Sequence, residues 1–183
     1  MSDTLPIAIS NTGPLISAFQ SDSLAVLTEL FSQVHVTRAC ITELTRHGWR
    51  DTLTYAHALI ITQALTPAED ALAQTYAQRI ANHPLSKDPV PANHLGEAEV
   101  MALAQRPQYM DTILLIDEQA ARVVALNMVL KVSGFAGVLL LAVNERLLTP
   151  DEVKRRLELC RTQGTHYSAA FIERAYQLAK AMS

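Results

Sequence analysis

The sequence predicts an α/β fold in which a small parallel sheet carries helices on both faces. Short apolar segments alternate along the 183-residue chain with stretches of helical periodicity, two capping boxes mark helix starts, and 49% of the residues are hydrophobic. Strands that alternate with helices form parallel sheets that are covered on both faces. In such sheets, the ligand site lies beyond the carboxyl ends of the strands. We therefore expect functional residues at strand ends.

In the first half of the chain, each short apolar strand leads into a stretch with helical spacing. Pro14 suits the first position of a helix, and Gly48 suits a helix end. Thr66-Pro67-Ala68-Glu69 combines a capping box with a proline at the first helical position. The expected elements are, in order, a strand at 6–10, helices at 14–19 and 21–31, a strand at 34–36, a helix at 38–47, a strand at 58–61 and a helix at 66–82.

In the second half, three prolines between residues 83 and 94 predict a surface loop, and Thr149-Pro150-Asp151-Glu152 repeats the capping box. We expect residues 1–148 to form one domain, with residues 149–183 as a C-terminal helical extension packed on it. The elements after the loop are a helix from 96 to about 106, strands at 112–117 and 129–132, and helices at 118–126, after 134–137, at 149–160 and at 168–181.

The charge balance excludes a polycation. Fifteen Lys and Arg residues stand against 18 Asp and Glu, which gives a net charge of −3. Nucleic acid would have to be held by a local basic patch or by metal ions. Lys154-Arg155-Arg156 with Arg161 is the densest basic segment, and it fits an RNA contact or a solvated helix face. Arg38, Arg46 and Arg122 are candidates for phosphate contacts and equally for surface ion pairs.

Cysteine usage and hydropathy predict a cytoplasmic protein. The longest apolar run, residues 135–143, is much shorter than the roughly 20 residues of a membrane span. The N-terminal residues lack the basic and apolar stretches of a signal peptide. Cys40 and Cys160 stand far apart and match no metal or redox spacing, so we expect two reduced, buried thiols.

Asn11 and Asp117 are the polar residues that follow apolar strands. The sheet rule places both near the same edge, and Glu118 adds a second acid after Asp117. The structural alternative is that each of these side chains caps the next helix. Spacing alone leaves both interpretations open.

Three further acids lie on predicted helices. Glu43 has Arg46 and His47 three and four residues later, so a solvated pair would explain it. Glu97 and Glu99 open the helix after the proline-rich loop, where acids suit the positive end of the helix dipole. They are separated by about 200° around the helix axis, so only one is expected to point inward. Periodicity does not indicate which one.

Five segments of the chain resemble, in order, the motifs of the PIN-domain family. The first four resemble its acidic motifs, and the fifth is similar to a glycine-containing segment of a VapC-like branch. The resemblance spans about residues 7–148. The segments are 10–16 (SNTGPLI), 36–44 (VTRACITEL), 95–104 (LGEAEVMALA), 114–122 (LLIDEQAAR) and 133–142 (SGFAGVLLLA).

This resemblance implies a three-layer α/β/α fold with a small central parallel sheet, and a metal-dependent endoribonuclease. Asn11 stands at the position of the first family acid, Glu43 at the second, Glu99 or Glu97 at the third and Asp117 at the fourth. The interval of 18 residues from Glu99 to Asp117 fits the family better than the interval of 20 from Glu97, so Glu99 is preferred. Glu118 is an additional candidate metal ligand.

Converging acids would require a cation. Two carboxylates about 4 Å apart repel by roughly 4 kcal/mol at an effective dielectric constant near 20. If Glu43, Glu99 and Asp117 meet at one sheet edge, a bound ion or protonation must offset that repulsion. Oxygen ligands favour Mg²⁺ or Mn²⁺, which can align a water for attack on a phosphodiester. RNA is the implied substrate and hydrolysis the implied reaction.

The amide at position 11 departs from the family pattern, which usually has Asp there. An Asn carbonyl can still ligate Mg²⁺ or Mn²⁺, but the site carries one negative charge fewer. This motivates an alternative function, a catalytically weak PIN-like module that binds RNA or a partner protein. An unrelated α/β module of the receiver or nucleotide-binding kind would instead place a pocket at the strand ends without converging acids.

The resemblance and the apolar helices also predict partners. Many relatives are toxins paired with an antitoxin protein, so an antitoxin is an expected partner. The helices near residues 24–31 and 135–143 carry more apolar surface than one thin sheet can cover, which predicts a homodimer that buries part of it. The C-terminal helices would wrap the dimer or recruit the antitoxin.

Overall fold

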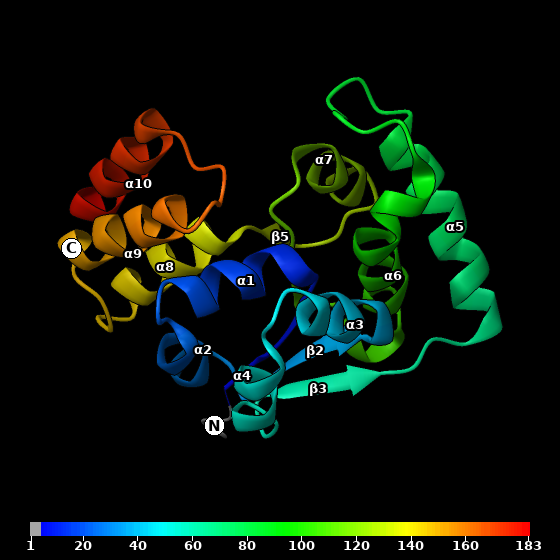
Figure 1. Ribbon diagram of the computed structural model, residues 1–183, viewed down its shortest axis with the longest axis horizontal. Helices are drawn as coiled ribbons and strands as arrows, with labels where there is room; N and C mark the ends of the chain where they lie inside the picture. The colour runs from blue at the N-terminus through cyan, green and yellow to red at the C-terminus, as the bar shows by residue number, and fades with distance from the viewer. Residues whose placement is uncertain (1–4) are drawn as a thin grey trace.

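The computed structural model describes residues 5–183 and shows a three-layer α/β/α fold around a parallel sheet (Figure 1). The five strands are hydrogen-bonded in the order β3-β2-β1-β4-β5. The expected fold class is confirmed. The strands are β1 (Ile7–Ser10), β2 (Gln33–Thr37), β3 (Ile60–Gln63), β4 (Ile113–Leu115) and β5 (Val132–Ser133).

Helices connect the strands and extend the chain after the sheet is complete. Two short 3₁₀ turns, η1 (Pro91–His94) and η2 (Pro107–Tyr109), lie before and after the helix at Leu95–Ala104. The α-helices are α1 (Thr12–Gln20), α2 (Leu24–Leu30), α3 (Arg38–Arg46), α4 (Arg50–Tyr55), α5 (Pro67–Ala81), α6 (Leu95–Ala104), α7 (Gln119–Asn127), α8 (Phe135–Asn144), α9 (Pro150–Thr162) and α10 (Ala169–Met182).

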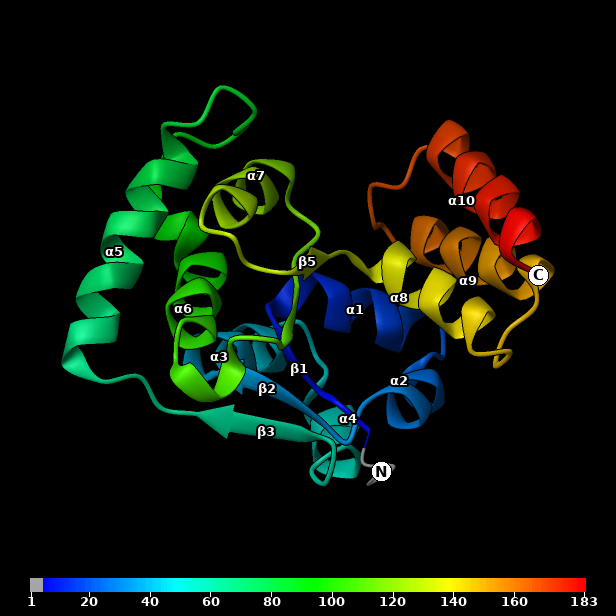
Figure 2. The same cartoon turned by 180° about the vertical axis from the view of Figure 1, so that it is seen from behind.

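The two faces of the sheet build separate apolar cores. Because successive strand residues point to opposite faces, Ala8 packs with one core and Ile9 with the other. The same alternation separates Leu115 from Leu114 in β4. The first core joins the sheet to α1, α2, α3 and α8, with α9 and α10 beyond them, and the second joins it to α5, α6 and α7 (Figure 2).

Both predicted capping boxes are present. At the start of α5, the Thr66 hydroxyl accepts from the Glu69 backbone N–H, and the Glu69 carboxylate accepts from the Thr66 backbone N–H. Thr149 and Glu152 do the same at the start of α9. Each pair satisfies two backbone N–H groups that a helix start leaves unpaired. These helix starts were therefore predictable to the residue.

Several boundaries differ from the expectations: α1 begins at Thr12, so Pro14 is its third residue rather than its first. β3 begins two residues later than predicted because the Ala56 carbonyl still accepts from the backbone N–H groups of Leu59 and Ile60. β5 begins at Val132 rather than at residue 129, because Val129 occupies a turn with a positive φ of 63°. β4 spans only 113–115 of the predicted 112–117. The unpredicted α4 has no buried residue and therefore shows no apolar periodicity.

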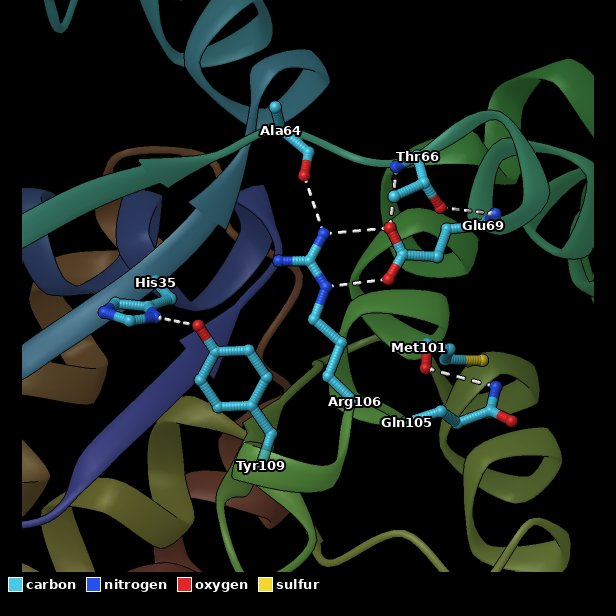
Figure 3. A network of polar contacts seen from close by, with 8 residues as sticks. All are labelled: His35, Ala64, Thr66, Glu69, Met101, Gln105, Arg106 and Tyr109. Carbon is cyan, nitrogen blue, oxygen red and sulfur yellow. Dashed lines mark hydrogen bonds and ion pairs between the residues drawn. The ribbon is translucent and has the colours of Figure 1, made fainter.

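A polar network fixes the layer formed by α5 and α6 against the sheet (Figure 3). Arg106 donates from Nε and Nη2 to the two oxygens of Glu69, at 2.7 and 2.8 Å, and from Nη2 to the Ala64 carbonyl at 2.7 Å. This guanidinium lowers the pKa of Glu69 to about 2. Close by, the hydroxyl of Tyr109 bonds His35 on β2. The network holds the start of α5 to the turn that follows α6.

The C-terminal helices pack on the same body as the sheet. Arg156 on α9 donates to the carbonyls of Ser21 and Asp22 and to the Ser23 hydroxyl, at 2.9, 2.7 and 3.0 Å. The thiol of Cys160 donates to the Ser17 carbonyl at 3.2 Å. Both cysteines of the chain are buried free thiols, as expected.

The apolar helices that motivated the homodimer prediction are covered within the chain. Phe135 and Leu139 of α8 are fully buried, and α8 packs against α9 and α10. Leu27 and Phe31 are buried as well. The homodimer stays a prediction, without support from uncovered surface on these two segments. Among residues 5–183, no helix has both the length and the apolar character needed to cross a membrane.

Candidate functional site

The carboxyl ends of β1 and β4 bring the predicted strand-end residues to the same place. Ser10 and Leu115 are register partners in the parallel pair, and the Asn11 N–H donates to the Leu115 carbonyl at 3.1 Å. Asn11 follows β1 directly and Asp117 follows β4 by two residues. Asn11 and Asp117 therefore follow neighbouring strands at the same edge of the sheet, as the sheet rule predicted from the sequence.

Asn11 occupies a helix N-cap position but its side chain does not cap. Its backbone is extended, with φ −83° and ψ −174°, and α1 receives no side-chain capping bond. Instead, Nδ2 donates to Oε1 of Glu97 at 3.0 Å, an interaction that orients the amide because only its NH₂ group can donate. The other end, Oδ1, is buried and has no hydrogen-bond partner among the described residues. A buried acceptor left in this state costs about 1–3 kcal/mol.

Glu43 is held beside Asn11 by the neighbouring threonine. The hydroxyl of Thr12 donates to Oε2 of Glu43 at 2.6 Å. The other carboxylate oxygen lies 3.9 Å from Nε2 of His47, between side chains that are about half exposed, so the solvated pair predicted on this helix is weak. Glu43 on α3 thus reaches the end of β1 although 32 residues separate it from Asn11.

The two glutamates that open α6 face different surroundings. Glu97 accepts from Asn11, and its pKa is raised by burial and then by the nearby charges of Glu43 and Glu118. Glu99 lies beside Thr37 and the backbone of α3, and burial raises its pKa. One of the pair was expected to point toward the site. The interval along the chain favoured Glu99, whereas the structure brings Glu97 to Asn11.

Asp117 is anchored on both oxygens. Oδ1 accepts from the backbone N–H of Phe135 at 2.8 Å, at the start of α8, and Oδ2 accepts from the hydroxyl of Tyr167 at 3.2 Å. Burial raises the pKa of Asp117, and these two donors together with the charge of Arg122 partly oppose the increase. A Cβ atom on Gly134 would lie 2.6 Å from Oδ1, which explains the glycine at this position.

Tyr167 is a site residue that the sequence did not reveal. Its hydroxyl also bonds the hydroxyl of Ser17 at 3.1 Å, and its ring stacks on Phe171 with centroids 5.2 Å apart. Burial and the charge of Asp117 raise the pKa of Tyr167. Fifty residues separate Tyr167 from Asp117, and no local pattern distinguishes it from the other tyrosines.

Helix capping, the structural alternative for the strand-end residues, applies to Glu118 alone. The side chain of Glu118 accepts from the Ala121 backbone and caps α7. Asn11 makes no capping bond to α1, and Asp117 bonds the start of α8, a helix that begins 18 residues later. Glu118 nevertheless lies close enough to Glu97 to raise its pKa.

The donor chemistry of the site fits a hard cation. A Cβ atom on Gly13 would lie 3.8 Å from Asp117 Oδ2 and 3.9 Å from Asn11 Oδ1, so both oxygens border the same glycine. Amide and carboxylate oxygens are ligands for Mg²⁺ and Mn²⁺. Within the described part of the chain, no three His, Cys, Asp or Glu side chains gather closely enough to hold a metal by themselves. An ion would therefore depend on the unpaired Asn11 oxygen.

The basic segment on α9 is mostly engaged in intramolecular contacts. Lys154 pairs with Glu173 at 3.0 Å, and Arg161 pairs with Glu158 at 2.8 Å. Arg156 is held by the turn between α1 and α2. Three of the four charges proposed as an RNA contact therefore stabilise the C-terminal helices.

A family model described as DUF3368, a PIN domain, matches residues 7–181. The chain belongs to the PIN-domain family. The match covers the sheet and both C-terminal helices, so the resemblance noted in five segments extends over nearly the whole chain. PIN domains are generally nucleases and typically use divalent metals, whereas the VapC-like branch stays a prediction. No curated protein sequence matches the chain.

Proposed function

We propose that this PIN domain is a metal-dependent endoribonuclease that hydrolyses RNA phosphodiesters. The observation that carries the proposal is the buried, unpaired Oδ1 of Asn11, which lies next to Gly13 together with an oxygen of Asp117. A folded protein tolerates such an acceptor where a ligand completes it. In a PIN domain with acids at the same strand ends, a divalent cation is the ligand that fits this chemistry.

The proposed roles follow from the contacts of each residue. Asn11, Glu97 and Asp117 would hold Mg²⁺ or Mn²⁺, and Glu97 takes the third acidic position in place of Glu99. When bound, the ion supplies an activated water and stabilises the leaving oxygen. Glu43, fixed by Thr12, and Glu118 add negative potential around the ion.

The electrostatics of the site favour a cation. Burial raises the pKa of both Glu97 and Asp117, which means that the folded protein disfavours their charged forms. A divalent ion would offset this cost by stabilising both carboxylates. Its binding would also release any proton that the acids carry, so affinity should rise with pH.

Cleavage of a labelled, structured RNA in Mn²⁺ tests the proposal. We expect cleavage by the wild-type protein, and a loss of at least 100-fold in kcat for Asp117→Asn and for Glu97→Gln, both nearly isosteric changes. Glu29→Gln, an exposed acid on α2, is the matched control and should cleave like the wild type. Equal cleavage by Asp117→Asn and wild type would refute the assigned site.

The toxin role known for many PIN relatives extends the proposal to partners. We propose that the chain acts as the toxin of a toxin–antitoxin pair, in which an antitoxin protein restrains the nuclease, and that it forms a homodimer. Induced expression in bacteria should arrest growth for the wild type and spare it for Asp117→Asn. Growth that is equally arrested by both, or by neither, would contradict the toxin role.

Specific contacts favour a second candidate, a catalytically weak module that binds RNA or a partner protein. Asn11 contributes no negative charge and its amide is engaged with Glu97, while both oxygens of Asp117 already accept hydrogen bonds. Calorimetry with millimolar Mn²⁺ separates the two candidates. Binding favours the nuclease, whereas its absence in the wild type, together with its appearance in Asn11→Asp, favours the weak module.

A further inference from the structure

A cavity of about 810 Å³ lies next to the candidate catalytic residues and has no role in the proposed chemistry. It opens between α3, α6 and the carboxyl ends of β2 and β3, and it shares Glu43 with the site. Gly96 lines it next to Glu43, where a Cβ atom would lie 3.9 Å from Glu43 Oε2. Its volume is within the range of pockets that hold small organic ligands. Polar side chains of its lining include Thr37, Arg38, Arg46, Gln63 and Glu99.

Thr37 contributes a buried polar side chain to the lining of this cavity. It ends β2, where it is the register partner of Gln63 on β3, and only 1% of its surface is exposed. Although Thr37 occupies the N-cap of α3, its hydroxyl makes no capping bond, and it acts instead on the neighbouring carboxylate of Glu99, whose pKa it lowers against the effect of burial. Thr37 and Glu99 therefore form a polar pair on the wall of the cavity.

Two arginines on α3 border the same cavity. Arg38 and Arg46 are exposed, and neither forms an ion pair with any residue between 5 and 183. Together with Thr42 they follow one side of the helix, since residues four apart are neighbours on its surface. Unpaired guanidinium groups at the edge of a polar cavity suit phosphate oxygens.

The charge of the lining excludes a ligand that is only an anion. Glu43, Asp70 and Glu99 outnumber the two arginines, so the cavity walls carry more negative than positive formal charge. A suitable ligand must combine phosphate for the arginines with hydrogen-bond donors for the acids. The lining contains no aromatic side chain, so recognition rests on hydrogen bonds rather than on stacking.

We propose that this cavity binds one nucleotide of single-stranded RNA beside the scissile phosphodiester. Arg38 and Arg46 contact the backbone phosphates, while Thr37, Gln63 and Glu99 hydrogen-bond the edge of the base. A carboxylate accepts from an exocyclic amino group, as in glutamate contacts to cytosine N4. The cavity therefore prefers adenine or cytosine to uracil. The inference deepens the proposed nuclease function, and it gives Glu99 a recognition role that is separate from metal binding.

The test measures RNA binding without metal and without cleavage. Fluorescein-labelled hexamers of A, C and U are titrated with the full chain in EDTA and followed by anisotropy, with inorganic phosphate as a competitor. We expect tighter binding of the A and C hexamers than of U, and little competition by phosphate. Equal affinity for all three hexamers would overturn the base preference.

Two sets of variants assign the contacts. Arg38→Ala with Arg46→Ala should weaken binding of every hexamer at least tenfold and reduce the slope of log K against log salt by about 1.4, since each phosphate contact to a single strand contributes about 0.7. Thr37→Val and Glu99→Gln should each reduce the preference for A and C about fivefold, the effect of one net hydrogen bond. Arg174→Ala, which changes an exposed arginine on α10, is the matched control.

The outcomes separate this inference from the proposed function. If the arginine variant keeps the wild-type affinity and salt slope, or if Thr37→Val and Glu99→Gln keep the base preference, the cavity is not the nucleotide site. Thermal unfolding of each variant excludes a folding defect as the cause of lost binding. If RNA binding follows these predictions but the protein cleaves no RNA, only the nuclease proposal is refuted. If the protein cleaves RNA but the variants bind RNA like the wild type, only the assignment of the cavity as the nucleotide site is refuted.

Discussion

Gly134→Ala tests whether the start of α8 positions Asp117. The new Cβ would lie 2.6 Å from Asp117 Oδ1, at least 0.4 Å inside the 3.0 Å below which real Cβ contacts essentially never occur. The φ of Gly134 is −104°, which any residue adopts, so backbone strain does not contribute. The carboxylate must move, and the hydrogen bond from the Phe135 N–H to Oδ1 is weakened or lost.

The expected cost has two parts. Loss of a hydrogen bond to a charged acceptor costs about 1.5–3 kcal/mol, and replacing Gly by Ala at an N-cap costs roughly 0.5–1 kcal/mol. We therefore expect a destabilisation of about 2–4 kcal/mol, or a decrease in Tm of about 4–16 °C for a chain of this size. Because Asp117 moves by a substantial fraction of an ångström, RNA cleavage should fall by about 100-fold.

Two further variants separate the clash from the loss of capping. Gly134→Ser restores a favourable N-cap residue but keeps the Cβ, so it should be nearly as destabilising as Ala. In an Asp117→Ala background the clash is absent, and Gly134→Ala should then add only the capping cost. Thermal and urea unfolding measure both effects. An equal cost of Gly134→Ala in the two backgrounds, or a wild-type Tm for Gly134→Ser, would refute the argument.

Three other variants test the electrostatics. Because burial raises the pKa of Glu97 and Asp117, the contribution of these two groups to the free energy of unfolding is largest below about pH 4 and is lost as pH rises through their folded-state pKa. Relative to the wild type, Glu97→Gln and Asp117→Asn should remove this loss between pH 4 and pH 8 in urea unfolding, and an unchanged profile would contradict it. Glu69, with a pKa of about 2, stabilises above its ordinary pKa near 4.5 and loses this effect as pH falls toward 2. Arg106→Lys should cost about 1 kcal/mol at pH 7 and clearly less at pH 2, where Glu69 is partly protonated; an equal cost at both would argue against the pair. Tyr167→Phe removes a donor from Asp117 and should lower kcat about tenfold with KM unchanged, whereas wild-type kcat would show that the hydroxyl does not position the acid.

Local chemistry made part of the fold predictable. The capping boxes at Thr66 and Thr149 fix helix starts through side-chain and backbone bonds within four residues, so the sequence alone contains the necessary information. The faces of β1 and β4 follow from the two-residue period of strands. By contrast, α4 has no fully buried residue and packs against the core through the partly buried Leu53. The boundary of β5 depends on a turn in which Val129 adopts a positive φ.

The candidate site was predictable where strand order decides the geometry. Asn11 and Asp117 meet because β1 and β4 are neighbours in the sheet, and the motif order indicated Glu43. To choose Glu97 over Glu99, one must know which side of α6 faces the site. The sequence of α6 does not show this, because the helix is apolar on nearly all sides. Tyr167 required the path of the C-terminal segment over the site, a tertiary contact without a local signal.

Diffraction from crystals containing Mn²⁺, with anomalous data collected near the manganese absorption edge, would locate an ion bound at the ends of β1 and β4. We expect an anomalous peak within about 2.5 Å of Asn11 Oδ1, with oxygens of Glu97 and Asp117 in its coordination sphere. A peak elsewhere on the protein, or none at millimolar Mn²⁺ and pH 7.5, would contradict this expectation.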